Sequence, residues 1–250
     1  MMLQGRTVLV TGVSRGLGRA VAEAVAAQGA NLVLADVDAA GGQATCAALT
    51  ENGAQARFLP LDLADPDSIA ALAENISARE GHLHGLVNNA AVATNVGGMG
   101  FEDIELALWD RVMTVNVRGT WLITRACADL LRASGSGRIV NVASDTALWG
   151  APRLLSYTAS KGAVMAMTRS LARELGPDGI GGACIAPGIL QTESTEYVPE
   201  ARHLLYSEGR AVPGPQGTGE AAGVAAFLVS NDAITLTGQV LPVNHGFCFS

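Results

Sequence analysis

The chain is 250 residues long, with 49% apolar residues, 16% charged residues and a formal net charge of −7. This composition excludes an intrinsically disordered chain, and the negative charge argues against nucleic acid or an anionic membrane as a partner. No apolar run reaches the ~18 residues of a membrane-spanning helix, and the strand-like start leaves no room for a secretory signal. We therefore expect a cytoplasmic protein of one domain, residues 1–250.

The cysteines are far apart and show no spacing typical of a metal site. We expect them to be reduced thiols, without disulfides and without a bound metal. They are Cys46, Cys127, Cys184 and Cys248.

Strand-like runs alternate with helix-length segments along the whole chain, which predicts an α/β fold. Specifically, we expect a Rossmann-type doubly wound parallel sheet of about seven strands, with helices on both faces. Strands are predicted at residues 7–10, 31–35, 56–61, 83–87, 138–142, 184–186 and 239–243. Helices are predicted at 16–28, 39–52, from Asp65-Pro66 onward, 101–133 with a break near Asn116-Val117, 156–175 and 219–230. The segment 189–215 is predicted to be a mobile flap with short helices over the substrate.

Polar residues and glycines stand at the carboxyl ends of the predicted strands. In open parallel sheets, ligands bind outside these ends. The residues concerned are Gly12, Asp36, Asp62, Asn88, Ser144 and Pro187. Their convergence predicts an active site along one edge of the sheet.

The segment TGVSRGLG, residues 11–18, joins the first strand to the first helix. Its glycines allow a tight turn and a close approach to a pyrophosphate, which the helix N-terminus attracts. The spacing G-x-x-x-G-x-G fits the general dinucleotide fingerprint only in part.

Asp36 follows the second strand, eighteen residues after Gly18. A carboxylate there can accept hydrogen bonds from the adenosine ribose hydroxyls and would repel a 2′-phosphate, which favours NAD over NADP. Arg15 instead favours NADP, because a cation near the ribose could contact a 2′-phosphate. We expect the effect of Asp36 to be the larger.

The stretch from Ser144 to Lys161 holds a possible proton-transfer site. Tyr157 and Lys161 are spaced to lie on one face of a helix. An ammonium near the phenol would lower its pKa, and Ser144 could hold a carbonyl or alcohol oxygen beside it. These groups suit the interconversion of alcohols with ketones or aldehydes.

Taken together, these motifs resemble the short-chain dehydrogenase/reductase family over essentially the whole chain. TGVSRGLG is similar to the family's glycine motif, Asp62-Leu63 to its adenine-contacting pair and NNAA at 88–91 to its N-N-A-G. The resemblance implies the catalytic residues Asn116, Ser144, Tyr157 and Lys161. It implies the cofactor-binding residues Gly12, Ser14, Arg15, Gly16, Leu17, Gly18, Asp36, Asp62, Leu63, Asn89, Ala90, Tyr157, Lys161, Pro187, Gly188, Ile189 and Thr192.

In the family's chemistry, Tyr157 would be the general acid/base and Ser144 would hold the substrate oxygen. Lys161 would lower the pKa of Tyr157 and bind the nicotinamide ribose. Asn116 would kink its helix and anchor a water that links Lys161 to solvent.

The sequence departs from the family pattern at several places. Ala91 replaces the last glycine of N-N-A-G, and Asp145 follows Ser144, with either a pocket role or a capping role open. Gly181-Gly182-Ala183 weakens the predicted start of the sixth strand.

The candidate substrate residues are Asp145, Trp149, Arg153 and Leu190. A mostly apolar lining, with Val92, Leu148 and Ile189, favours a small to medium alcohol or carbonyl compound. Arg153, Arg202, His203 and Tyr206 either meet a substrate carboxylate or are solvated.

The sequence thus predicts an NAD-dependent oxidoreductase acting on a small-molecule alcohol, ketone or aldehyde. One alternative is an NADP-dependent 3-oxoacyl thioester reductase of the same family, and another is a non-catalytic dinucleotide sensor. A homotetramer or dimer is expected, with the apolar end 246–250 at a subunit interface.

Overall fold

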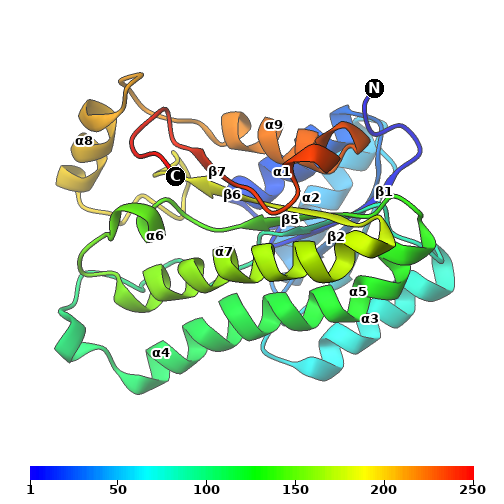
Figure 1. Ribbon diagram of the computed structural model, residues 1–250, viewed down its shortest axis with the longest axis horizontal. Coiled ribbons are helices and arrows are strands. Elements are labelled where there is room, and N and C mark those ends of the chain that lie inside the picture. Colours follow the sequence, from blue (N-terminus) through cyan, green and yellow to red (C-terminus); the bar gives the residue numbers. More distant parts are fainter.

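The computed structural model describes residues 1–250 and contains a seven-stranded, wholly parallel sheet in the order β3-β2-β1-β4-β5-β6-β7. Figure 1 shows this sheet between two layers of helices. The strands are β1 (Thr7–Thr11), β2 (Asn31–Asp36), β3 (Ala56–Pro60), β4 (Gly85–Asn88), β5 (Arg138–Val142), β6 (Gly181–Pro187) and β7 (Val240–Val243). The predicted doubly wound sheet is confirmed.

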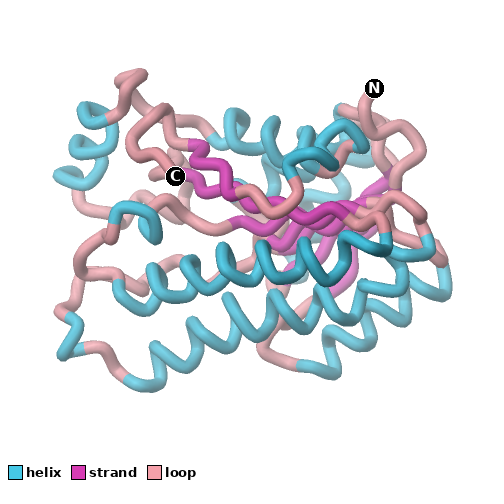
Figure 2. Tube along the Cα trace, in the orientation of Figure 1, coloured by secondary structure: helices cyan, strands magenta, loops and turns pink.

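Helices cover both faces of the sheet. On one face lie α1 (Gly16–Ala27), α2 (Ala39–Glu51) and α9 (Thr218–Leu228). On the other lie α3 (Pro66–Arg79), α4 (Leu106–Met113), α5 (Thr120–Ala133) and α7 (Leu155–Leu175). The tube in Figure 2 shows the strands enclosed between these layers.

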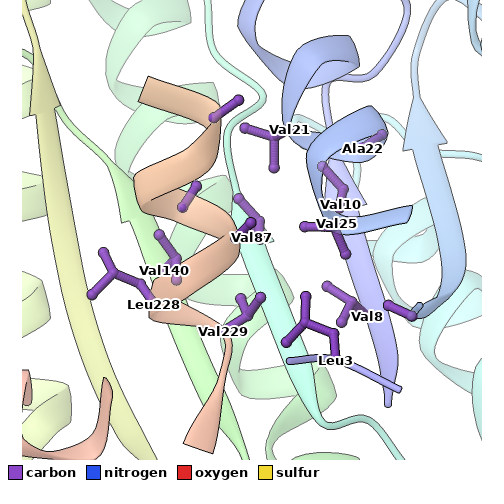
Figure 3. Close-up of a cluster of buried hydrophobic side chains, with 14 of the residues drawn as sticks. Leu3, Val8, Val10, Val21, Ala22, Val25, Val87, Val140, Leu228 and Val229 are labelled. Atoms are coloured by element: carbon purple, nitrogen blue, oxygen red, sulfur yellow. The ribbon is translucent and has the colours of Figure 1, made fainter. Parts of the chain in front are cut away.

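The core consists of two large apolar clusters, one on each face of the sheet. Figure 3 shows the first, in which Val21 and Val25 of α1 pack with Leu228 against Val10 and Val140 of the strands. The second cluster packs α3 and α5 against the opposite face. Every residue of β1, β4 and β5 is buried, and each strand has an apolar centre of two or three residues, as expected for parallel strands covered on both sides.

Two predicted boundaries were wrong. The sixth strand begins at Gly181 rather than Cys184, and all its residues are buried. Side chains of the following segment fill the space above it: a Cβ at Gly181 would lie 2.9 Å from Ile234 and Thr237 atoms. Gly181 therefore lets neighbouring side chains approach the strand, and the glycine pair does not end it.

The fourth helical region is also more broken than predicted. Residues Phe101–Asp103 form a single 3₁₀ turn, and regular helix starts only at Leu106. Between α4 and α5 the chain makes a π-helical segment, Thr114–Gly119, around Asn116. The predicted break near Asn116 is therefore present as an extra residue in the helical turn.

The segment after β6 contains a helix, α8 (Glu200–Gly209), which is the core of the predicted flap. A one-turn helix that the sequence did not predict, α6 (Thr146–Trp149), follows β5 directly. Figure 1 shows α6, α8 and the C-terminus at the same end of the molecule. No helix in the structure is both long enough and apolar enough to cross a membrane.

Candidate active site

The turn between β1 and α1 leaves no room for a side chain at Gly12 or at Gly18. A Cβ on Gly12 would lie 2.7 Å from the Ala90 Cα, and a Cβ on Gly18 would lie 1.9 Å from the Gly12 carbonyl oxygen. Asn89 holds the turn, because its Nδ2 donates to the carbonyl oxygens of Thr11 and Gly12 at 3.0 Å each. The glycines thus allow strand, turn and helix to pack at backbone contact.

The N-terminus of α1 has free backbone donors. Its N-cap is Arg15, whose side chain makes no capping hydrogen bond, so the first N–H groups of the helix have no side-chain partner. With the helix dipole, such groups form an anion site next to the glycine turn. This arrangement fits the pyrophosphate of a dinucleotide, with Ser14, Gly16 and Leu17 in the same turn.

Asp36 is fixed at the tip of β2. Its carboxylate accepts hydrogen bonds from the backbone N–H of Ser14 at 2.8 Å and of Asp38 at 2.9 Å. It is 8% exposed, so it is almost enclosed by protein. The Ser14 contact places the carboxylate beside the glycine turn, where the adenosine ribose of a bound dinucleotide would lie.

Other predicted cofactor residues border the same edge. Asp62 is exposed beyond β3, and Leu63 is buried against Gly119. An open cleft of about 660 Å³ lies at the start of α1 and the flap, and Gly16 and Thr192 both line it. The two residues are close, because a Cβ on Gly16 would lie 3.6 Å from the Thr192 side chain. The structure therefore brings the glycine turn, Thr192 and the tip of β2 to one edge, as the strand-end argument predicts.

Tyr157 and Lys161 lie one turn apart on α7, with the Lys161 Nζ 5.5 Å from the centre of the Tyr157 ring. Ser144 follows β5, and its hydroxyl interacts with that of Tyr157, which favours a lower pKa of the phenol. Lys161 Nζ donates to the Val142 carbonyl oxygen at 2.8 Å, which anchors the ammonium to the end of β5. These three side chains therefore share one site.

The protonation of this site is governed by burial. Desolvation raises the pKa of Tyr157 above its usual value, and the neighbouring Ser144 offsets this only in part. Desolvation also lowers the pKa of Lys161 to about 8. Lys161 is not among the groups that shift the pKa of Tyr157 in this ligand-free arrangement, so the expected lowering by Lys161 stays a prediction.

Asn116 is 1% exposed and its side chain connects two elements. Its Oδ1 accepts from the Val92 N–H at 2.8 Å, and its Nδ2 donates to the Val92 carbonyl oxygen and to Ser160 Oγ at 3.1 Å each. Asn116 thus ties the loop after β4 to α7, close to Tyr157. Its predicted water stays a prediction.

Of the predicted substrate residues, Arg153 is exposed, Leu190 is buried and Trp149 is partly buried. Arg153 has a left-handed backbone, with φ of 56°. The Arg202 guanidinium lies over the Trp149 ring at 5.3 Å.

The capping role considered for Asp145 was wrong, because its carboxylate makes no capping hydrogen bond to α6. The side chain is 0% exposed, and its role towards the substrate stays a prediction. The carboxylate accepts from the Tyr206 hydroxyl at 2.6 Å and from Asn244 Nδ2 at 3.1 Å. Tyr206 is itself 2% exposed, so the solvated alternative for this residue was also wrong.

Tyr206 and Asn244 belong to this edge, although the sequence reasoning did not place them at the site together. Asn244 directly follows β7, so the strand-end rule that identified Ser144 and Pro187 could have found it. No pattern in the sequence indicates the partner of Tyr206.

Burial raises the pKa of Asp145 to about 6, although Tyr206, Asn244, Arg210 and Trp149 favour its ionised form. Because the unfolded chain ionises near pH 4, the folded state holds the extra proton between pH 4 and 6, and stability should fall as pH rises through this range. The expected loss is about 3 kcal/mol. Urea unfolding of the protein and of Asp145→Asn from pH 4 to 7 checks this, and parallel curves would contradict it.

Comparison with known proteins places the chain in a family. A family model described as enoyl-(acyl carrier protein) reductase, of the short-chain dehydrogenase type, matches residues 12–248. The 3-alpha-(or 20-beta)-hydroxysteroid dehydrogenase of Mycobacterium tuberculosis is 35% identical over 98% of this chain and 90% of its own. The 3-oxoacyl-[acyl-carrier-protein] reductase of Escherichia coli is 32% identical over 98% of both chains. The cyclopentanol dehydrogenase of Comamonas testosteroni is 34% identical over 97% of this chain and 96% of its own.

Solved structures of related proteins superimpose on nearly the whole chain. A protein from Beutenbergia cavernae, assigned as an NAD(P)-dependent gluconate 5-dehydrogenase and holding NADP at low occupancy, superimposes with a TM-score of 0.91. It is 33% identical and the match covers 98% of this chain and 97% of that one. Levodione reductase gives a TM-score of 0.88 at 32% identity, covering 98% of both chains. The chain therefore belongs to the short-chain dehydrogenase/reductase family of NAD(P)-using oxidoreductases, as its motifs predict.

Proposed function

We propose that this protein is an NAD-dependent dehydrogenase that oxidises a small to medium, partly apolar alcohol to a ketone or aldehyde. The preference for NAD rests on one observation, the nearly enclosed carboxylate of Asp36 beside the glycine turn. An anion held there by two backbone donors favours ribose hydroxyls and disfavours a 2′-phosphate. The expected physiological direction is oxidation of the alcohol.

In this proposal the bound nicotinamide supplies the hydride acceptor, and the protein manages the proton. Tyr157 takes the hydroxyl proton of the alcohol on oxidation and returns it on reduction. Ser144, at the end of β5, holds the substrate oxygen. Lys161 supports the ionised phenol electrostatically, and Asn116 fixes the loop that borders the pocket.

Asp36→Ala should relax the cofactor preference. We expect the ratio of kcat/KM for NAD to that for NADP to fall by about ten- to a hundredfold, since a repulsive group against the 2′-phosphate is lost. Steady-state kinetics with both cofactors measure this. Asp38→Ala is the matched control, because Asp38 caps α2 through Gly41 N–H and should affect stability but not preference. Higher wild-type activity with NADP than with NAD would contradict the assignment.

A second candidate is an NADP-dependent 3-oxoacyl thioester reductase. Arg15 favours it, because this exposed side chain at the N-terminus of α1 makes no hydrogen bond or ion pair within the chain. One relative at 32% identity is a reductase of this type, and one similar structure holds NADP. Reduction of a 3-oxoacyl thioester with NADPH, faster than any alcohol oxidation with NAD, would favour this candidate.

The substrate class is proposed from the lining of the site. Val92, Leu148 and Ile189 follow the carboxyl ends of β4, β5 and β6 and are partly exposed, so they offer apolar surface at this edge of the sheet. The relatives include dehydrogenases of hydroxysteroids and of cyclopentanol. A panel of secondary, cyclic and benzylic alcohols, followed by NAD reduction, tests the class. Carboxylated alcohols belong in the panel because Arg202 and His203 lie on the flap.

We also propose that the chain assembles as a homotetramer or dimer. Large apolar side chains are exposed on α4 and α5, with Leu106 79% and Trp121 44% exposed. At the C-terminus, Phe247 packs within the chain against Tyr206, whereas Phe249 is 81% exposed. Sedimentation velocity should show a species of two or four chains, and a monomer at micromolar concentration would contradict this.

A further inference from the structure

Three segments that are distant in sequence meet at the side chain of Asp145. The first is the short segment between β5 and α6, which contains Asp145 itself and, next to it, Ser144. The second is the flap helix α8, which supplies Tyr206, and the third is the segment after β7, which supplies Asn244. Each carboxylate oxygen accepts one of these donors, so the link is complete and fully buried.

The hydroxyl of Tyr206 is held from both sides. It donates to Asp145 at 2.6 Å and accepts from Trp149 Nε1 at 3.0 Å. Its ring stacks on Phe247, with centroids 4.1 Å apart and an angle of 20° between the planes. The flap helix is thereby fixed to α6 and to the C-terminal segment.

The orientation of the Asn244 amide is also fixed. Its Oδ1 accepts from the backbone N–H groups of Gly246 and Phe247 at 3.1 and 3.2 Å, which leaves Nδ2 to donate to Asp145. The carboxylate at position 145 therefore accepts from two donors, and each donor connects it to a different segment, α8 or the residues after β7.

This link touches the backbone that borders the reacting groups. The Asp145 N–H donates to the Pro187 carbonyl oxygen at 3.0 Å. A Cβ on Gly188 would lie 3.0 Å from both Asp145 Oδ2 and Tyr206 Cε1. Displacement of the carboxylate would therefore move Ser144 on one side and Pro187-Gly188 on the other.

We propose that Asp145 is a positioning residue, which holds the flap and the C-terminal segment in place through Tyr206 and Asn244 and thereby fixes Ser144. Asp145 itself does not touch the substrate. The catalytic consequence rests on the proposed role of Ser144, whereas the ordering of the flap does not depend on that role.

Asp145→Asn keeps the volume but replaces one acceptor oxygen with a donor nitrogen. Turned towards Asn244, the new N–H meets another donor, and turned towards Tyr206, it leaves the Tyr206 O–H without an acceptor. In either orientation one buried donor is therefore unpaired. Tyr206→Phe removes one donor and keeps the stacked ring. In both variants we expect hydrogen exchange of the backbone amides in residues 192–210 of the ligand-free protein to accelerate about tenfold. We also expect the KM for the alcohol to rise about tenfold, with a smaller decrease in kcat.

The double variant Asp145→Asn with Asn244→Asp restores the link between the two positions. The new amide at 145 donates to the new carboxylate at 244, whose other oxygen still accepts from Gly246 and Phe247. The donation from Asn244 Nδ2 to the Cys248 carbonyl oxygen at 3.4 Å is lost, so we expect flap exchange and KM to return only part of the way to the wild-type values. Trp149→Phe serves for comparison, because it removes a donor to Tyr206 but leaves both donors to Asp145, and flap exchange should accelerate less than in Asp145→Asn.

Unchanged flap exchange in Asp145→Asn and Tyr206→Phe would overturn the proposal, as would a double variant as fast in exchange as Asp145→Asn alone. Recovery by the double variant excludes general misfolding as the cause. If no variant and no wild-type protein oxidises alcohols with NAD, the proposed function fails, and the exchange data still decide whether Asp145 orders the flap.

Discussion

Replacing Tyr157 by Phe should lower kcat by about 10²- to 10⁴-fold while the affinity for the dinucleotide changes little. The phenol oxygen of Tyr157 is the titratable group of α7 that interacts with Ser144, which makes it the candidate for exchange of the substrate proton. Lys161 donates to the Val142 carbonyl oxygen, so its nitrogen is occupied at the end of β5. The Phe variant keeps the ring packing and removes only the oxygen.

The measurement is steady-state turnover combined with a titration of the dinucleotide by tryptophan fluorescence or calorimetry. Tyr197→Phe is the matched control. Tyr197 is 46% exposed on the flap and its hydroxyl donates to the Ala93 carbonyl oxygen, so its loss should change kcat by less than about tenfold. A Tyr157→Phe variant with a tenth or more of wild-type turnover would mean that another group transfers the proton. A wild-type protein that binds the dinucleotide without turning over any substrate would favour the non-catalytic sensor.

Much of this fold follows from local signals in the sequence. Buried parallel strands require apolar runs such as Thr7–Thr11, and alternating helices require the spacing seen in α1 and α3. The start of α3 was predicted in detail, because Asp65 accepts from the Asp67 N–H and Pro66 opens the helix. The strand-end rule also predicted that Asp36 and Ser144 lie at one edge of the sheet.

The environment of Asp145 could not be predicted in this way. Its partners are 61 and 99 residues away along the chain, and they reach it only through the packing of α8 and the turn after β7. An Asp after a strand is typically exposed or a cap, and local sequence carries no signal for burial. The start of β6 was missed for a related reason. A glycine pair disfavours a strand locally, and only the structure shows that the side chains of Ile234 and Thr237 occupy the space beside Gly181.

Gly18→Ala should impair both stability and dinucleotide binding. An added Cβ would lie 1.9 Å from the Gly12 carbonyl oxygen and 2.4 Å from Asn89 Nδ2. The first contact is with backbone, so α1 must move away from the β1 turn, and overpacking of this kind costs about 1–3 kcal/mol or more. The same movement displaces the free N–H groups at the start of α1, so we expect dinucleotide affinity to fall by at least about tenfold.

Denaturant unfolding and dinucleotide titration of the same preparation separate the two effects, and Gly223→Ala supplies the matched control. Gly223 is an exposed interior position of α9, where an added Cβ meets no atom within 4 Å. There the substitution should raise stability by about 0.5–1 kcal/mol, because alanine loses less backbone entropy in a helix. A loss of stability in Gly18→Ala together with a gain in Gly223→Ala would show that glycine is required at position 18 because of the contact with Gly12. A Gly18→Ala variant as stable as the wild type, with unchanged dinucleotide affinity, would mean that α1 is not held at backbone contact with the turn.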